Sequence, residues 1–267
     1  MKKMESNTSE TGYKECYVAF LDILGFKAFV EENSFERVCG VLSSSEIEAI
    51  VNPPALKAKF NMKDNDISVL CISDSIIISI EKSAPNAFEA IVWLCAAFQV
   101  AQFLSNGLLM RGGICCGDFY IEYSERTGDP VLFGKAYNDA VVLEKEARYP
   151  RILVSKDLEK EVGTTAPLYL TVDSEDGLIF VDYMRIKKNE KVAGGYAKQL
   201  AHAAKAIMKL DSQVPGIKEK CDWTKRYINS SIDVDIFSEE YLSQHEIDKR
   251  RIHLEFNIGG TSFDRKS

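Results

Sequence analysis

An α+β fold with an antiparallel-rich sheet and a helical C-terminal extension is predicted by three features of the 267-residue sequence. Strand-like and helix-like patterns alternate in the order β-α-β-β-α-β through the first two thirds of the chain. Polar breaks at 73–75 and 174–177 separate pairs of β-rich runs, which indicates two hairpins. After residue 190 the pattern becomes helical and begins with an Ala-rich segment at 193–210.

The first strand is predicted at Tyr17–Leu21, and Asp22 stands at its end. An ionised Asp this deep in an apolar run is costly unless something pairs with it. A divalent cation is the obvious partner, because hard cations take carboxylate and backbone carbonyl oxygens. The amides of Leu24, Gly25 and Phe26 open the next helix, where phosphate oxygens bind readily. The alternative that stays open is an Asp that caps this helix at a buried junction.

The remaining elements follow from periodicity and from Pro and Gly breakers. The pattern from 26 to 51 matches the helical period imperfectly, so two helices are possible there. Pro85 suits a first helical turn and Asn106-Gly107 a helix end. The predictions are helices over 26–51, 85–106, 136–148, 156–162, 193–210, 216–228 and 238–251, strands over 67–72, 76–80, 108–123, 151–155, 168–172 and 178–183, and a loop over 124–130.

This order is that of a ferredoxin-like split βαβ core with antiparallel pairing. It places Asp22 and Asp74, which lie far apart in the sequence, on neighbouring strand ends. Two carboxylates that converge there repel each other unless cations lie between them. That is the geometry of a two-metal phosphoryl-transfer site. The alternative for Asp74 is an ordinary turn residue.

Composition restricts the classes of function. A net charge of −7 argues against a nucleic-acid-binding face. The longest apolar stretch, Ala87–Leu104, is interrupted by Glu89, Gln99 and Gln102, which indicates a buried helix and no membrane partner. Seven cysteines without a Cys-x-x-Cys motif and three histidines argue against a zinc site. No signal peptide is visible, so the expected location is the cytoplasm.

Four short motifs occur in order between about residues 15 and 185. They are Phe20-Leu21-Asp22-Ile23-Leu24-Gly25-Phe26, Ser73-Asp74-Ser75, Met110-Arg111-Gly112-Gly113-Ile114-Cys115-Cys116-Gly117, and Gly134-Lys135-Ala136-Tyr137-Asn138-Asp139-Ala140 with Leu143-Glu144 after it. Their order and spacing resemble class III nucleotidyl cyclases, the adenylate and guanylate cyclases. In that family the first two motifs bind metal, and the others are an Arg-x-Gly strand and an Asn-x-Ala helix. The resemblance implies a catalytic domain over 15–190, after a flexible tail at 1–14 and before an extension at 191–267.

The resemblance also implies roles for individual residues. Asp22, Asp74 and the Ile23 carbonyl hold two Mg²⁺ or Mn²⁺ ions, which lower the pKa of the ribose 3′-hydroxyl and neutralise the triphosphate that leaves as pyrophosphate. Phe20 and the turn after the first strand contact the nucleotide. Arg111 grips the β- or γ-phosphate with its planar fork.

Asn138 orients the ribose from the partner subunit, which implies a homodimer with sites at its interface. Structural alternatives stay open for these residues as well. Arg111 would otherwise pair with Glu122 or Asp118 on its own strand. Asn138 would otherwise cap the N-terminus of its helix.

Three positions depart from the family pattern. Val142 stands where class III cyclases usually carry an Arg that stabilises the transition state, and Lys145 or Arg148 could substitute. Leu70 and Val131 occupy the purine-selecting positions, so the polar groups that read a purine are absent. These departures resemble the bacterial pyrimidine cyclases of Pycsar antiphage defence, which make cyclic CMP or cyclic UMP for a separately encoded effector. The alternatives are a purine cyclase and a degenerate cyclase fold that binds nucleotide without catalysis.

Overall fold

The computed structural model describes residues 12–42, 58–63, 66–164, 169–185, 196–213, 216–232 and 234–245. The strands are β1 (Lys14–Leu24), β2 (Ile67–Ile72), β3 (Ser75–Glu81), β4 (Leu109–Tyr123), β5 (Pro130–Phe133), β6 (Ile152–Val154), β7 (Leu170–Val172) and β8 (Ile179–Val181). The helices are α1 (Phe26–Glu32), α2 (Phe35–Leu42), α5 (Ala87–Asn106), α6 (Lys135–Glu146), the 3₁₀ turn η1 (Lys156–Leu158), α7 (Glu159–Thr164), α9 (Tyr196–Gln213), α10 (Lys218–Ile232) and α11 (Glu239–Gln244).

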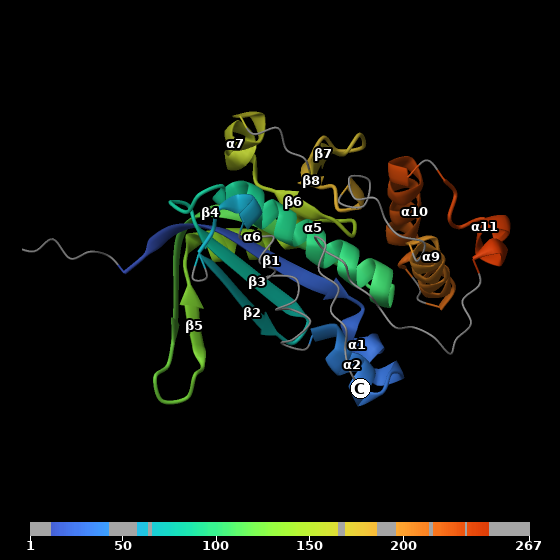
Figure 1. The fold of residues 1–267 in the computed structure, drawn as a ribbon, viewed down its shortest axis with the longest axis horizontal. Helices are drawn as coiled ribbons and strands as arrows, with labels where there is room; N and C mark the ends of the chain where they lie inside the picture. Colours follow the sequence, from blue (N-terminus) through green and yellow to red (C-terminus); the bar gives the residue numbers. More distant parts are fainter. Residues whose placement is uncertain are drawn as a thin grey trace, which may run out of the picture.

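A single twisted sheet forms the centre of the molecule (Figure 1). Its strand order is β2-β3-β1-β4-β6-β8-β7, and β5 pairs with the far end of β4. Within the described residues every pairing is antiparallel except that of β4 with β6. β1 lies between β3 and β4, which α5 connects, so the predicted split βαβ core is confirmed. The predicted helical C-terminal part is also present, as α9, α10 and α11.

Helix α5 forms the hydrophobic centre on one face of the sheet. It is long and apolar enough to cross a membrane, but 94% of its most apolar window is buried inside the protein. The side-chain amides of two of its polar residues donate hydrogen bonds to backbone carbonyls, Gln99 to Met110 (3.3 Å) and Gln102 to Val41 (3.0 Å). The prediction of a buried helix over this stretch is therefore confirmed.

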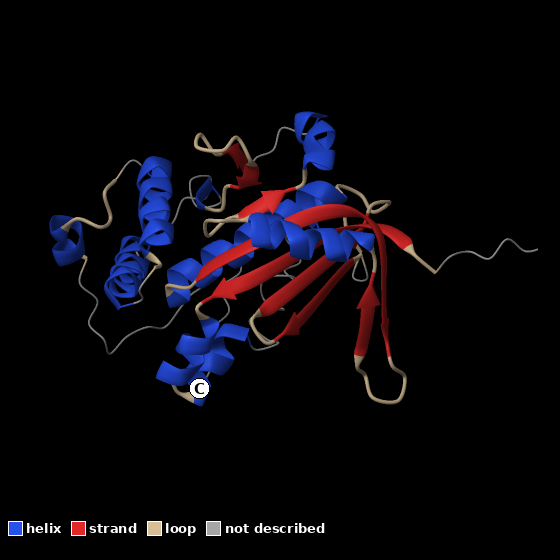
Figure 2. Ribbon diagram, turned by 180° about the vertical axis from the view of Figure 1, so that it is seen from behind, coloured by secondary structure: helices blue, strands red, loops and turns tan. Residues whose placement is uncertain are grey.

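Helix α6 packs against β4 and β1 on the opposite face of the sheet (Figure 2). Its approach requires glycine in β4. A Cβ atom on Gly113 would lie 2.7 Å from the Ala140 carbonyl oxygen and 2.7 Å from the Leu143 Cβ, both on α6. Real side chains do not pack this closely. Gly113, the glycine of the Arg-x-Gly motif, therefore sets the distance between α6 and strand β4, which carries Arg111.

The far half of β4 and the short strand β5 form a hairpin that extends from the body of the molecule (Figure 1). Tyr123, Val131 and Phe133 are exposed on it. The sequence predicts a loop over 124–130 and no strand after it, so β5 was missed. Pro130 donates no backbone hydrogen bond and only three residues follow it before Gly134, which leaves too short a pattern to detect.

Some predicted boundaries differ from the observed ones. The predicted helix over 26–51 is two helices, α1 and α2, as far as residue 42, and the break lies at Asn33-Ser34. Residues 43–51, 1–11 of the predicted tail, and 246–251 of the last predicted helix lie outside the described residues. Strand β1 already begins at Lys14. Helices α9 and α10 contribute buried side chains to the same core as the sheet, and the domain boundary near residue 190 stays a prediction.

Candidate active site at the end of strand β1

The structure brings Asp22 and Asp74 to the same edge of the sheet. The backbone amide of Ile23 donates to the Asp74 carbonyl (3.1 Å), and Asp22 lies opposite Ser75 in the β1–β3 register. Helix α1 begins only after Gly25, which occupies the N-cap position with a left-handed φ of 74°. Asp22 lies within β1, so the interpretation of this residue as a helix cap is wrong.

The hairpin between β2 and β3 carries Asp74 at its tip. The preceding residue, Ser73, has a φ of 57°, a left-handed conformation that is uncommon for a residue other than Gly or Asn. The family motif that this stretch resembles usually has Gly at that position. The chain therefore keeps the backbone shape of the motif with a less suitable residue, and such local strain is often found at functional sites.

Arg111 connects the edge to helix α6. It lies directly opposite Asp22 in the β1–β4 register, with its Nε 3.5 Å from Asp22 Oδ2, and it forms a second ion pair with Glu144. Pairing with Glu122 or Asp118, the structural alternative from the sequence, is wrong. Those residues lie on the same extended strand, and at roughly 3.3 Å per residue even the nearer one is about 23 Å away.

Burial and charge act together on the carboxylates of this site. Burial raises the pKa of Asp22, Arg111 opposes this effect, and the neighbouring Asp74 raises the pKa further. Burial likewise raises the pKa of Glu144, Arg111 again opposes it, and Asp22 adds to the rise. The three acidic groups therefore hold more negative charge than one arginine compensates, and a bound cation would relieve the excess.

The donor set fits a hard cation that is shared with a substrate. Among the described residues, no cluster of three or more His, Cys, Asp or Glu side chains is arranged to hold a metal ion alone. Mg²⁺ in phosphoryl-transfer sites is usually held by one or two carboxylates together with phosphate oxygens and water. Asp22 and Asp74 supply two such carboxylates at the open edge of the sheet.

Glu144 ends the fourth motif, but the sequence assigned it no role in the site. It lies in the run Glu144-Lys145-Glu146, which has the composition of a solvent-facing helix, yet only 3% of its surface is exposed. The signal that identifies it is its spacing. Ala136, Ala140 and Glu144 recur every four residues, and all three are buried on the face of α6 that packs on the sheet.

Asn138 lies on the exposed surface of α6. The helix begins at Lys135 after a Gly134 N-cap, and the Asn138 amide donates to the Gly134 carbonyl (3.1 Å), so Asn138 is not a cap. Val142, one turn further along, is 56% exposed. Of the two residues that could replace its missing cation, Arg148 forms an ion pair with Glu219, whereas Lys145 is exposed to solvent.

A partly exposed apolar surface lies on the same face of the sheet as Asp22. Phe20, two residues before Asp22, packs edge-on against Tyr137 with ring centroids 6.0 Å apart. Leu70 and Leu132 pack against the same small cluster. Val131 is 46% exposed, because neighbouring residues of a strand point to opposite faces. The structure therefore groups Leu70 with Leu132 and not with Val131, the predicted base-selecting residue. Leu132 and Val131 are both apolar.

Comparisons with known proteins identify structural but not sequence relatives. No protein-family model matches the sequence, and no curated protein matches it. Three solved structures illustrate the similarity. The adenylyl cyclase CyaB from P. aeruginosa is 16% identical, with 63% of this chain and 93% of that chain covered and a TM-score of 0.43. The dimeric guanylyl cyclase domain of the RhoGC fusion protein from Blastocladiella emersonii is 15% identical, with 63% of this chain and 96% of that chain covered and a TM-score of 0.48. The adenylate cyclases from Trypanosoma brucei, in a monomeric state, are 15% identical, with 65% of this chain and 90% of that chain covered and a TM-score of 0.43.

Proposed function

We propose that this chain is a metal-dependent nucleotidyl cyclase, which converts a nucleoside triphosphate to its 3′,5′-cyclic nucleotide and pyrophosphate. The observation that carries the proposal is the meeting of Asp22 and Asp74 at one edge of the sheet, beside Arg111. Two partly buried carboxylates that a single arginine does not neutralise contribute little to the stability of the fold. They have a clear use as ligands for Mg²⁺ or Mn²⁺.

The side chains of the site take complementary roles in this proposal. Asp22 and Asp74, with the Ile23 carbonyl, hold two ions, which supply charge stabilisation for the triphosphate and activation of the 3′-hydroxyl. Arg111 keeps its contact with Glu144 and turns its free nitrogens toward the β- or γ-phosphate. The backbone amides of the Leu24-Gly25-Phe26 turn bind phosphate oxygens.

We further propose that the base is a pyrimidine. The surface formed by Phe20, Leu70, Leu132 and Tyr137 offers only one polar side-chain group, the Tyr137 hydroxyl. A purine-specific site instead needs paired donors and acceptors, because it rejects the wrong base by leaving buried polar groups unpaired. By its resemblance to the Pycsar enzymes, the product is a second messenger for antiphage defence that acts in the cytoplasm on a separate effector protein. A neighbouring gene for such an effector would support this role.

Incubation of the purified protein with ATP, GTP, CTP and UTP at equal concentrations tests the proposal. With Mn²⁺ or Mg²⁺ present, we expect cyclic CMP or cyclic UMP at least about tenfold in excess of the purine products, as identified by mass spectrometry. A dominant cyclic AMP or cyclic GMP product would contradict the pyrimidine assignment alone. The exposed Val142, in place of the usual arginine, favours a second candidate, a module that binds nucleotide without catalysis. Nucleotide binding without any cyclic product would support that candidate.

A homodimer with shared sites completes the proposal. Asn138 is exposed on α6 and makes no contact with Asp22 or Asp74 within the described chain, so its ribose-orienting role requires a second copy. The hairpin of β4 and β5 presents Tyr123, Val131 and Phe133 to solvent. Exposed apolar side chains that gather on one projecting element are typical of a contact surface.

Mixing two inactive variants tests whether the sites are shared. Asp74→Ala and Asn138→Ala are each expected to be inactive alone, since each damages both sites of its own homodimer. An equal mixture is expected to recover about one quarter of the wild-type rate, because random exchange makes half of the dimers mixed and each mixed dimer has one intact site. Subunit exchange is checked separately with two fluorescent labels. Complete exchange without recovered activity would contradict shared sites.

A further inference from the structure

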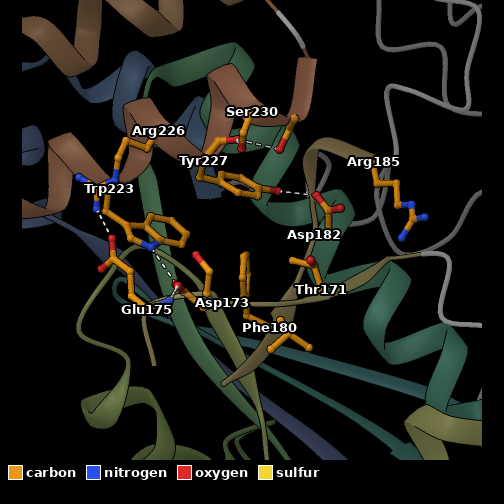
Figure 3. Close-up of a pocket in the computed structure, with 13 residues that line it drawn as sticks. Thr171, Asp173, Glu175, Phe180, Asp182, Arg185, Trp223, Arg226, Tyr227 and Ser230 are labelled. Atoms are coloured by element: carbon orange, nitrogen blue, oxygen red, sulfur yellow. Dashed lines mark hydrogen bonds and ion pairs between the residues drawn. The ribbon is translucent and has the colours of Figure 1, made fainter. Parts of the chain in front are cut away.

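Helix α10 and the β7–β8 hairpin enclose a cavity of about 630 Å³, separate from the candidate site at Asp22 (Figure 3). Cavities of about 300–1,000 Å³ are typical of small-molecule sites. Two hydrogen bonds join its walls, because Trp223 Nε1 donates to Asp173 (2.9 Å) and the Tyr227 hydroxyl donates to Asp182 (2.8 Å). The cavity is therefore a built feature of the fold, with one wall from the helix and one from the sheet.

The aromatic side chains of the cavity are almost fully buried. Trp223 is 4% exposed and stacks with Tyr149 and Tyr227, with ring centroids 5.4 and 5.3 Å apart. Phe180 meets both Trp223 and Tyr227 edge-on at 5.6 Å. A nucleobase needs an open ring face on which to stack, and this cluster leaves little. The rings therefore form an apolar wall, and recognition of a ligand depends on the polar groups around it.

Most charged groups that line the cavity already have a partner of opposite sign. Asp173 pairs with the buried Arg151, and Glu175 pairs with Arg226 (2.6 Å). One further carboxylate and one further guanidinium line the cavity. The charges that remain for a ligand are therefore one of each sign. A molecule that complements both of them carries one positive and one negative group of its own.

The two remaining groups are Asp182 and Arg185, and within the described residues neither forms an ion pair. The Arg185 amide donates to the Asp182 carbonyl (3.2 Å), which closes a turn and brings their α-carbons within about 7 Å. The carboxylate of Asp182 is partly buried and accepts from the neutral Tyr227 hydroxyl through Oδ1. Figure 3 shows Asp182 and Arg185 at one end of the cavity and the Glu175–Arg226 pair at the other. A partly buried carboxylate without a cation is costly unless a ligand supplies one.

We propose that this cavity binds a small zwitterion, a free α-amino acid, with its ammonium group at Asp182 and its carboxylate at Arg185. One carbon atom separates the two charged groups of an amino acid, which suits two partners on a single turn. A planar guanidinium matches a carboxylate with two parallel hydrogen bonds. The Ser230 and Ser231 hydroxyls donate to the Tyr227 carbonyl (2.9 and 2.7 Å) and keep lone pairs that accept from the ammonium. The side chain of the amino acid lies against the apolar wall.

Addition of each of the twenty L-amino acids to the full-length protein tests the proposal. A ligand that binds only the folded state raises the melting temperature in a saturable way, and we expect this of at least one amino acid. Calorimetry then gives its Kd. The methyl ester of that amino acid keeps the ammonium alone, and the N-acetyl derivative keeps the carboxylate alone. Each derivative is expected to bind about 10- to 100-fold more weakly, the range for a lost hydrogen bond to a charged group.

Variants of the two charged residues locate the binding. Arg185→Met and Asp182→Asn are each expected to weaken binding about 10- to 100-fold. Asn keeps an acceptor for the Tyr227 hydroxyl, and Arg185 is exposed, so Arg185→Met reports on binding independently of any change in the fold. Arg148→Met and Asp222→Asn are the matched controls. Their charged groups pair with Glu219 and Lys218 outside the cavity, so both variants are expected to bind as wild type does.

Three results would overturn the inference. The first is a melting temperature that no amino acid raises in a saturable way. The second is binding of the methyl ester or the N-acetyl derivative as tightly as the parent amino acid. The third is Arg185→Met and Asp182→Asn proteins that bind as the two controls do. None of these measurements uses cyclisation, so the outcome is independent of the proposed cyclase function.

Discussion

Asp22→Asn is expected to lower kcat/KM for cyclisation more than about 100-fold, beyond the 10- to 100-fold typical for loss of an outer-sphere partner of a metal ligand. The substitution keeps the shape of the side chain and removes the charge that would hold a cation. Asp74→Asn is expected to have the same effect. The measurement is initial rate with Mn²⁺ and Mg²⁺ at saturating metal concentrations. Retention of rates within about threefold of wild type would contradict the assignment of these carboxylates.

The same substitution is expected to leave the protein at least as stable as wild type in the absence of metal. Burial raises the pKa of Asp22 above its unfolded value, so the ionised carboxylate disfavours the folded state. Stability from this group is present at low pH and is lost as pH rises through the raised pKa. Asn does not ionise, so the melting temperature of Asp22→Asn should fall less than that of wild type as the pH rises through this interval.

Asp118→Asn is a matched control for both measurements. Asp118 is exposed on β4 opposite Glu15, at the end of β1 remote from Asp22. Its substitution is expected to change neither the cyclisation rate nor the melting temperature. Loss of activity together with loss of folded protein in Asp22→Asn alone would instead indicate that Asp22 supports the fold.

The fold was predictable where local pattern and topology agree. The β2–β3 hairpin is flanked by two apolar runs, and its polar break at 73–75 leaves little freedom in the register that places Asp74 beside β1. Strand β5 and the true length of β1 were not predictable in this way. Strand β1 continues through Asp22 to Leu24, because pairing with β4 satisfies its backbone beyond the apolar run.

The site was predictable for residues to which the family motifs assign a role, and less so for Glu144, which stands in the fourth motif without an assigned role and depends on packing. Glu144 is buried only because Gly113 allows α6 to approach β4, and a single sequence does not reveal that distance.

The contacts between helix α10 and the β7–β8 hairpin include Asp173, which also pairs with Arg151, the centre of a buried charge cluster that the sequence did not reveal. Its side chain is completely buried and forms ion pairs with Asp173 and Asp176. The guanidinium also lies over the rings of Tyr149, Phe180 and Trp223, at 5.2, 5.7 and 5.8 Å from their centroids. Asp173 accepts a further bond from the Trp223 indole, so Arg151 links strand β6 to helix α10 through a shared carboxylate.

Arg151→Met is therefore expected to lower the free energy of unfolding by about 3–5 kcal/mol, because it leaves the buried Asp173 without its cation. Urea unfolding followed by tryptophan fluorescence and circular dichroism measures the change. Arg148→Met is the matched control. Its arginine is mostly exposed and pairs with Glu219 at the surface, so a loss of under about 1 kcal/mol is expected.

A double variant separates the stranded charge from the lost packing. Adding Asp173→Asn to Arg151→Met removes the uncompensated carboxylate but keeps its bond to Trp223, so part of the stability should return. If Arg151→Met destabilises no more than Arg148→Met, the cluster does not hold α10 in place.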